Sequence, residues 1–462
     1  MARRFMDFCD SYSPHFIRQG MNGVHHARCY VSGLLGTQRR KNIETIENDV
    51  SESDYQGLEQ FISSSPWSHE AVLEQLSLEV DELLGDAAES GLFIDESSFL
   101  KKGNASVGVQ RQWSGRAGKI ENCQVGVFAA IARGERMCLT DFRLFLPESW
   151  AGDAERCEKA KIPAEHRRHR SKWQLGLELV KSARERGLRF GWVGADSLYG
   201  GTADFINGVE DLGETFMADI NVTNKIWTSC PLLEPGPALE PPPSAQAKSG
   251  PGRMGRPRKH ARLSPANTAQ YLSVKEWSER HFAKESREIV YRTGAKGELR
   301  AKLWTREVWT WEPGGKEGGP RKRQLVVRQD RDGGMKYSLT NLPAGLDWER
   351  YGYVQGQRFW IEHAFHEAKS HLGMAQYQVR VWKGWHHHMS LICLGMLFLL
   401  KEQRLHEPSH PLLSNRDLTE LLDYYLPRRE RSEEAVLQKI QNRHRKRQQD
   451  LNRRRKSRNL TK

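Results

Sequence analysis

The chain has 462 residues, enough for two or three domains with a sizeable buried core. The apolar stretch Met389–Leu400 is shorter than the ~20 residues that a membrane-spanning helix needs, and Met1–Gly20 does not resemble a signal peptide. The seven cysteines are scattered, odd in number and without a Cys-x-x-Cys pair, which is typical of a reducing cytosol and argues against structural zinc. We therefore expect a cytoplasmic protein without a membrane partner.

The net charge of +13 is concentrated at the C-terminus. Residues 428–462 hold 14 Lys and Arg against 4 Asp and Glu, so this tail carries +10 and the remaining body about +3. Such a tail indicates a nucleic-acid partner because each neutralised phosphate releases counterions, although a solvated disordered tail has the same composition. The apolar residues Ala435, Val436, Leu437 and Ile440 predict a helix in the first half of the tail.

Residues 1–88 are predicted to form an N-terminal helical domain. Apolar residues recur every three to four positions in Tyr30–Asn42 and in Tyr55–Leu76, and Ser65 followed by Pro66 is typical of a helix start. A basic cluster in this region could contact DNA or could belong to a packing surface; its members are Arg39, Arg40 and Lys41.

From Gly91 onward the sequence predicts short apolar strands mixed with helices. The expected strands are Gly91–Phe99, Cys123–Arg133, Arg136–Leu146, Arg189–Ala195 and Thr215–Ile220, and the expected helices are Lys172–Arg186 and Ala203–Val209. Two aspartates stand at the carboxyl ends of the first and fourth strands, namely Asp95 and Asp196. The order β-β-β-α-β-α-β is that of the ribonuclease-H-like fold, and ligands of open α/β sheets bind at such strand ends. Either aspartate alone would be an ordinary cap or turn residue.

A proline-rich basic linker is expected at residues 223–267. Nine of the chain's 19 prolines lie in Pro231–Pro265, so this segment should be extended or disordered. Within it, Gly255–Lys259 could place Arg256 and Arg258 in the minor groove of DNA, or it could be a plain basic linker.

Glycine-rich turns after the linker separate strands that predict an all-β insertion at residues 268–345. The expected strands are Arg287–Arg292, Leu299–Trp311, Gln324–Arg328 and Met335–Thr340. Three tryptophans of the insertion, Trp304, Trp309 and Trp311, are expected to pack in the core or on a sheet face, with stacking on an unpaired base as the alternative.

After the insertion, Arg358, Glu362 and Lys369 recur along one stripe of a predicted helix, at ~100° per residue. Aromatic and aliphatic residues around the stripe place it near a core. A carboxylate between two cations suits a metal ion and a phosphodiester, whereas an ordinary amphipathic helix has the same spacing. Two strand-end aspartates upstream favour the first interpretation, with Glu362 as the third carboxylate.

Three consecutive histidines, His386 to His388, cannot chelate one metal ion together, because adjacent helical residues face different directions. They are expected to begin the buried helix Met389–Leu400 or to contact DNA.

Six segments carry a resemblance that covers most of the chain. They are Gly33–Glu44, Ile94–Gly103, Gly108–Val127, Gly194–Gly200, Arg358–Gly373 and Tyr377–Arg380. Together they resemble the DDE-type transposases of bacterial insertion sequences, in the branch with a β-domain inserted between the second and third catalytic carboxylates.

The resemblance implies that Asp95, Asp196 and Glu362 are the catalytic, metal-binding triad, with Glu96 as an alternative to Asp95. Arg358 and Lys369 match the Arg and Lys of the family's tyrosine–arginine–glutamate–lysine signature. The tyrosine of that signature falls at Gln355 here, and Tyr353 lies close but out of register.

Three carboxylates suit an in-line displacement at phosphorus, in which two divalent cations ~3.5–4 Å apart activate the attacking oxygen and stabilise the leaving one. Hard oxygen ligands favour Mg²⁺, for which Mn²⁺ can substitute. Asp95 would bridge both ions, while Arg358 and Lys369 would hold the flanking phosphates. Further phosphate contacts are expected from a basic loop, whose charges could equally be solvated: Lys101, Lys102, Arg111, Arg116 and Lys119.

The expected fold is α/β: a ribonuclease-H-like catalytic domain, residues 89–222 and 346–405, is interrupted by the all-β insertion. The N-terminal helical domain precedes it, and a basic helical C-terminal tail, residues 406–462, follows. The expected function is that of a DNA transposase, acting as a homodimer or higher oligomer at the nucleoid. It would cleave DNA at the inverted-repeat ends of a mobile element and join the 3′-OH ends to target DNA. The alternatives are a transposase-derived DNA-binding protein and a metal-dependent nuclease without strand transfer.

Overall fold

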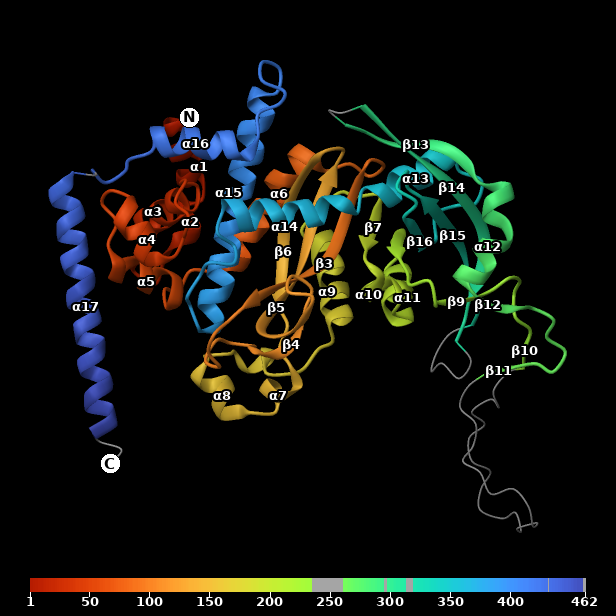
Figure 1. Ribbon diagram of the computed structural model, residues 1–462, viewed down its shortest axis with the longest axis horizontal. Helices are drawn as coiled ribbons and strands as arrows, with labels where there is room; N and C mark the ends of the chain where they lie inside the picture. The colour runs from red at the N-terminus through yellow and green to blue at the C-terminus, as the bar shows by residue number, and fades with distance from the viewer. Residues whose placement is uncertain (235–260, 295–296, 313–318, 431, 460–462) are drawn as a thin grey trace, which may run out of the picture.

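The computed structural model describes residues 1–234, 261–294, 297–312, 319–430 and 432–459 (Figure 1). Arg256 and Arg258, with the rest of Gly255–Lys259, lie outside these ranges. No helix within them combines the length and the apolar character needed to cross a bilayer. All seven cysteines are free thiols.

Five strands form the centre of the main sheet: β3 (Ser90–Leu100), β5 (Lys119–Arg133), β6 (Arg136–Leu144), β7 (Trp192–Ala195) and β8 (Phe216–Asp219). Their spatial order is β6-β5-β3-β7-β8. β3 is antiparallel to β5 and parallel to β7, and β7 is parallel to β8. The mixed α/β class and the order of the predicted strands along the chain are therefore confirmed, whereas a further strand, β4 (Gln110–Ser114), which pairs with β5, was not predicted.

The two faces of β3 are covered by different helices, because successive side chains on a strand point in opposite directions. Ile94 packs against Gly176 of α9 (Lys172–Glu185), where an added Cβ would approach within 3.1 Å. On the other face, Phe128 stands opposite Asp95 in the register and makes an edge contact with Phe365 of α14 (Phe359–His371). Asp95 therefore points toward α14.

The insertion continues the main sheet. Its strands β13 (Arg287–Gly294), β14 (Gly297–Thr310), β15 (Arg321–Gln329) and β16 (Met335–Thr340) match the predicted ones within a few residues. β16 pairs with β8, with Leu339 opposite Ala218, so within the described residues both parts belong to one sheet of 12 strands (Figure 1).

The insertion is not all-β as expected, because it also contains the helix α12 (Val274–Glu285). Ser273 and Glu276 form a capping box at its start, which is a local sequence signal for a helix. The remaining strands near it are short: β9 (Lys225–Trp227), β10 (Leu233–Glu234), β11 (Arg262–Leu263) and β12 (Tyr271–Ser273).

The N-terminal region is helical, as predicted, apart from a short hairpin. Its helices are α1 (Ala2–Ser11), α2 (Ser13–Phe16), α3 (Val24–Leu34), α4 (Ile43–Asp49), α5 (Tyr55–Ser63) and α6 (His69–Leu84), and its strands are β1 (Ile17–Arg18) and β2 (Met21–Asn22). Two expected boundaries were wrong. The helix predicted to run to Asn42 ends at Leu34, and α6 begins after Ser68, whose Oγ accepts from the Ala71 N–H, rather than at Ser65 and Pro66.

The helix α15 (Trp382–His406) runs between the N-terminal helices and the main sheet (Figure 1). Met389–Leu400 is buried throughout, as predicted. His386, His387 and His388 are buried too, so the expectation that they could contact DNA was wrong. The ring of His387 stacks on Trp67 at 3.6 Å, and burial lowers its pKa to about 3.

The basic tail is helical. α16 (Asn415–Tyr425) precedes α17 (Glu433–Asn459), which extends well beyond the predicted first half of the tail. α17 stands at the side of the molecule that carries the N-terminal helices (Figure 1).

Candidate active site

The strand pairing places Asp95 and Asp196 side by side. Ile94 and Ala195 form the last pair between the parallel strands β3 and β7, and each is followed directly by one of the two aspartates. Asp95 is half-buried, and its removal from water, and next the charge of Asp196, raise the pKa of its carboxyl well above the usual range.

Asp196 ends β7 and caps the short helix α10 (Ser197–Gly200). Its carboxylate accepts a hydrogen bond from the Leu198 N–H at 3.0 Å. Burial, and next the charge of Glu96, raise the pKa of Asp196. The site therefore holds more negative charge than its surroundings neutralise, a condition that a bound cation relieves.

Glu362 lies in the first turn of α14, and its side chain is 52% exposed. Its Oε1 accepts from Nη2 of Arg358 at 2.7 Å, the i, i+4 pair expected of the helical stripe. Nε of Arg358 donates to Oδ2 of Asp219 at 2.8 Å. Burial works against the charge of Arg358, but Asp219 and Glu362 outweigh it and raise its pKa.

Asp219 was not predicted from the sequence as a residue of the site. It ends β8, the third parallel strand of the sheet, just as Asp196 follows β7. The signal was present, because the predicted strand Thr215–Ile220 carries this acid near its carboxyl end. Its role became visible only with Arg358, which is 139 positions away in the chain.

Gln355, where the family signature has tyrosine, belongs to the network behind Arg358. Its Nε2 donates to Oγ of Ser338 at 2.8 Å, and that hydroxyl donates to Oδ1 of Asp219 at 2.6 Å. Tyr353 points elsewhere, with its hydroxyl donating to the Glu89 carbonyl at 3.2 Å. A buried chain of polar groups thus runs from the insertion strand β16 to Arg358.

Glu96, the alternative first ligand, is occupied by other groups. Its Oε1 accepts from Nζ of Lys172 at 2.7 Å, and its Oε2 accepts from the Tyr199 hydroxyl at 3.3 Å. Since neighbouring residues of a strand face opposite sides, Glu96 points away from α14. Asp95 is therefore the better placed of the two.

Lys369 lies near Asp95 from the last turn of α14. The ammonium group is partly buried, and burial, with a smaller contribution from Arg116, lowers its pKa to about 8. Asp95 opposes that shift, which places the carboxylate within electrostatic reach of the ammonium. Arg358 and Lys369 thus lie at the start and the end of the helix that passes the two aspartates.

The other predicted phosphate contacts divide into exposed and packed residues. Lys102, Arg111, Arg116 and Lys119 are exposed. Lys101 instead packs over the ring of Tyr377 at 3.4 Å, and burial lowers its pKa to about 7. A free phosphate-binding role for Lys101 is not supported by this packing.

Lys41 is buried, which corrects the prediction that it could contact DNA, while Arg39 and Arg40 are exposed. Its Nζ donates to the Leu34 carbonyl at 2.6 Å and to the carbonyl of His371, the last residue of α14. The Lys41 side chain also fills the space where a Cβ on Gly373 would lie, at 2.6 Å, and Gly373 has φ +71°. Lys41 is therefore a structural support for the end of α14.

The donor set fits a divalent metal, although Glu362 is engaged elsewhere. Within the described ranges, no three His, Cys, Asp or Glu side chains converge closely enough to hold an ion, and Glu362 is paired with Arg358. Two half-buried carboxylates with raised pKa values, Asp95 and Asp196, offer hard oxygen donors and surplus negative charge. Glu362 is half-exposed and lies one helical turn after Arg358. The positive charge of Arg358 partly offsets the negative charge of the two aspartates.

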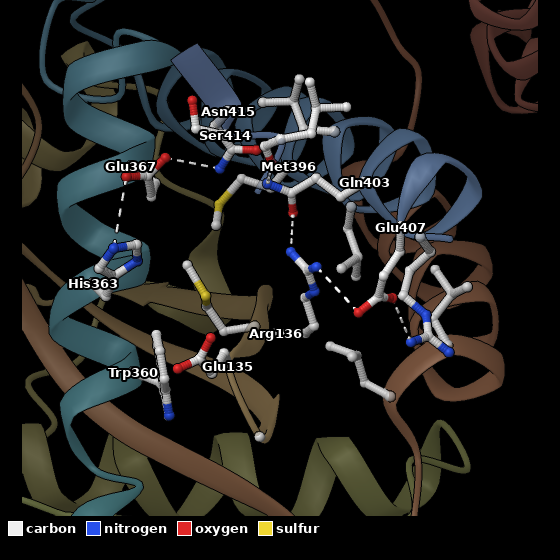
Figure 2. Close-up of a pocket in the computed structure, with 18 of the residues that line it drawn as sticks. Glu135, Arg136, Trp360, His363, Glu367, Met396, Gln403, Glu407, Ser414 and Asn415 are labelled. Carbon is white, nitrogen blue, oxygen red and sulfur yellow. Dashed lines mark hydrogen bonds and ion pairs between the residues drawn. The ribbon is translucent and has the colours of Figure 1, made fainter. Parts of the chain in front are cut away.

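A separate cavity of about 790 Å³ lies on another side of α14, between α14, α15 and the turn after β5 (Figure 2). Its polar side chains bond to one another: Glu367 accepts from Asn415, and Arg136 donates to Gln403 and to Glu407. None of the three predicted catalytic residues lines it. The candidate active site and this cavity are thus distinct.

Residues 18–297 match the family model described as "DDE superfamily endonuclease". The chain belongs to the DDE endonuclease superfamily. The matched range contains Asp95 and Asp196 and ends before Glu362.

The chain is also similar to a curated relative from Microchaete diplosiphon, described as "Probable transposase for insertion sequence element IS701". The two are 29% identical over 194 residues, which is 41% of this chain and 46% of the relative. The match therefore spans about half the length of that relative.

Proposed function

We propose that this chain is a DNA transposase that cleaves DNA at the ends of a mobile element and joins the 3′-OH ends to target DNA. The observation that carries the proposal is the pair of half-buried aspartates that directly follow the last paired residues of β3 and β7, with α14 bringing Glu362, Arg358 and Lys369 past them. Membership of the DDE endonuclease superfamily and the similarity to an insertion-sequence transposase support it.

Asp95, Asp196 and Glu362 would hold Mg²⁺ ions, two for each active site, with Mn²⁺ as a substitute. Bound ions of this kind activate an attacking oxygen and stabilise the leaving one in phosphoryl transfer. Asp95 and Asp196 are already fixed by the sheet, whereas Glu362 must leave Arg358 to join them.

Arg358 then has a second role. In the structure it neutralises Glu362 and Asp219 at once. When Glu362 turns toward the aspartates, Nη2 of Arg358 becomes free to hold a DNA phosphate while Nε stays on Asp219. Lys369 would bind a phosphate at the other end of α14.

The test uses the purified full chain, Mg²⁺ and DNA carrying the inverted repeats that flank its gene. Cleavage and joined products that disappear in Asp196→Ala would support the proposal, with Asp211→Ala as a matched control, because Asp211 forms an exposed ion pair with Arg321. Binding without cleavage would instead indicate a transposase-derived DNA-binding protein. Cleavage without joining would indicate a nuclease. Sedimentation of the DNA complex would test the proposed homodimer or higher oligomer.

A further inference from the structure

Trp113 differs from every other tryptophan of the chain in its exposure. All 14 tryptophans lie within the described ranges, and 13 of them are buried or half-buried. Trp113 is 58% exposed, and its cross-strand neighbour Ile120 is 56% exposed. Because paired residues of adjacent strands lie on the same face, the two side chains form one apolar platform on a β-hairpin.

The hairpin that carries this platform is fixed in place. It consists of β4 (Gln110–Ser114) and the start of β5, and its turn closes when the Ala117 and Gly118 N–H groups donate to the Ser114 carbonyl. The Ser114 hydroxyl lies 2.7 Å from that of Ser98 on β3. In the β-ladder Ser114 stands opposite Lys119 and Ser98 opposite Val125, so the hairpin folds back along β3.

The hairpin tip also approaches the candidate active site. Ser98 lies three residues after Asp95 on β3, on the opposite face of the strand, and Arg116 in the turn is close enough to Lys369 of α14 to influence its charge. The exposed cations Arg111 and Arg116 flank the platform. An exposed aromatic ring among cations matches a nucleic-acid strand, which presents a base and a phosphate at each step.

We propose that Trp113, with Ile120 beside it, stacks an unpaired base of the DNA strand that passes the candidate active site. The inference rests on the proposed function only in taking DNA as the substrate. It assigns base stacking to this hairpin rather than to the tryptophans of the insertion. Trp304 is buried, with its Nε1 donating to Glu285, and Trp311 packs beside Trp227.

Fluorescence anisotropy without divalent ions tests the inference, since no cleavage is needed. The probes are a labelled oligothymidine and a fully paired duplex of the same length. Trp113→Ala should weaken oligothymidine binding by about 5- to 150-fold, the range found when one stacked base is lost, and should leave duplex binding unchanged. Trp113→Phe should retain most of the affinity because it keeps an aromatic face.

Two further variants separate stacking from charge and from folding. Arg116→Ala should weaken both probes and lower the salt dependence, as expected of a phosphate contact. Leu78→Ala, which truncates a side chain of similar exposure on α6, should change neither. Unchanged melting temperatures would confirm that all variants are folded.

The inference is overturned if Trp113→Ala weakens both probes equally or neither, or if the wild-type protein does not bind oligothymidine. A change in sedimentation instead of affinity would assign the platform to a second copy of the chain and would also overturn it. Cleavage and joining are measured separately with Mg²⁺. If both activities are present although the stacking inference fails, the proposed function stands; if they are absent too, both proposals fail.

Discussion

The candidate active site and the histidine cluster of α15 both bury several titratable groups, yet they differ in how charge is balanced. His387 is neutral, and each of its ring nitrogens lies within 3.0 Å of a carbonyl oxygen, of Ile62 or of Trp67. Asp95 and Asp196 lie beside each other with surplus negative charge. Burial of titratable groups alone does not mark a functional site, whereas uncompensated charge does.

The largest effect is expected at Asp95, in the site whose negative charge is not neutralised. Asp95→Asn should lower Mg²⁺-dependent cleavage by more than ~100-fold, because losing a group that merely supports a metal ligand already costs about 10–100-fold. Mg²⁺ should raise the melting temperature of the wild type but not of the variant. A variant that is still stabilised by Mg²⁺ would exclude Asp95 as a ligand.

The same variant should be more stable than the wild type without metal. The folded-state pKa of Asp95 is raised, so the wild type loses stability as pH rises from the ordinary carboxyl pKa through the raised one. Asparagine removes this loss. Thermal melts should show no gain near pH 4 and the largest gain at pH 8, and a gain independent of pH would contradict the assigned cause.

His387→Leu should lower the stability of the protein, whereas Asp95→Asn should raise it. The leucine leaves one carbonyl, that of Ile62 or that of Trp67, without the single N–H that the neutral ring donates, which costs about 1–3 kcal/mol for a buried polar group. The melting temperature should fall equally with and without Mg²⁺. If the variant instead lost its response to Mg²⁺, the histidine cluster would not be purely structural and the comparison would fail.

Asp219→Asn should have a smaller effect on the active site. It removes the charge that holds Nε of Arg358 but keeps an acceptor for the Ser338 hydroxyl. Mg²⁺ affinity, measured by calorimetry, should change by about 10-fold, as for other groups that position a metal ligand. Asp211→Asn, which breaks an exposed ion pair with Arg321, is the control and should change nothing.

The smallest expected effect concerns Lys369. Its pKa of about 8 means that the ammonium loses its charge between pH 7 and pH 9, so duplex affinity should fall over this interval. One exposed charge pair corresponds to about 2- to 5-fold. Lys369→Arg stays charged and should flatten this part of the titration. Identical slopes for the two proteins would show that Lys369 does not touch the DNA.

The central strands could be predicted from the sequence because short apolar runs and their flanking turns are local signals. Asp95, Asp196 and the stripe on α14 followed from the same patterns. The charge partners could not be predicted in this way. That Arg358 would pair with Asp219, and that Gln355 would join them through Ser338, depends on β16 pairing with β8, a contact between distant segments.

The wrong expectations have the same origin. Lys41 looked like a surface cation because its neighbours Arg39 and Arg40 are basic, and nothing local indicates that two carbonyl groups would enclose it. Helix α3 stops at Leu34 although the apolar spacing continues. The helix α12 of the insertion was not predicted, because strand-like patterns surround it in the sequence. The domain boundaries proposed from composition remain predictions, since the sheet itself runs through the insertion.

The hydrogen bond from Lys41 to the last carbonyl of α14 limits where the chain can be truncated. The N-terminal helices supply the ammonium group that satisfies the last carbonyl of the helix carrying Glu362, and Gly373 leaves room for it. A catalytic core expressed without its first 88 residues would leave that end of the helix frayed. When segments are exchanged between related proteins, Lys41 and Gly373 should therefore be taken from the same parent.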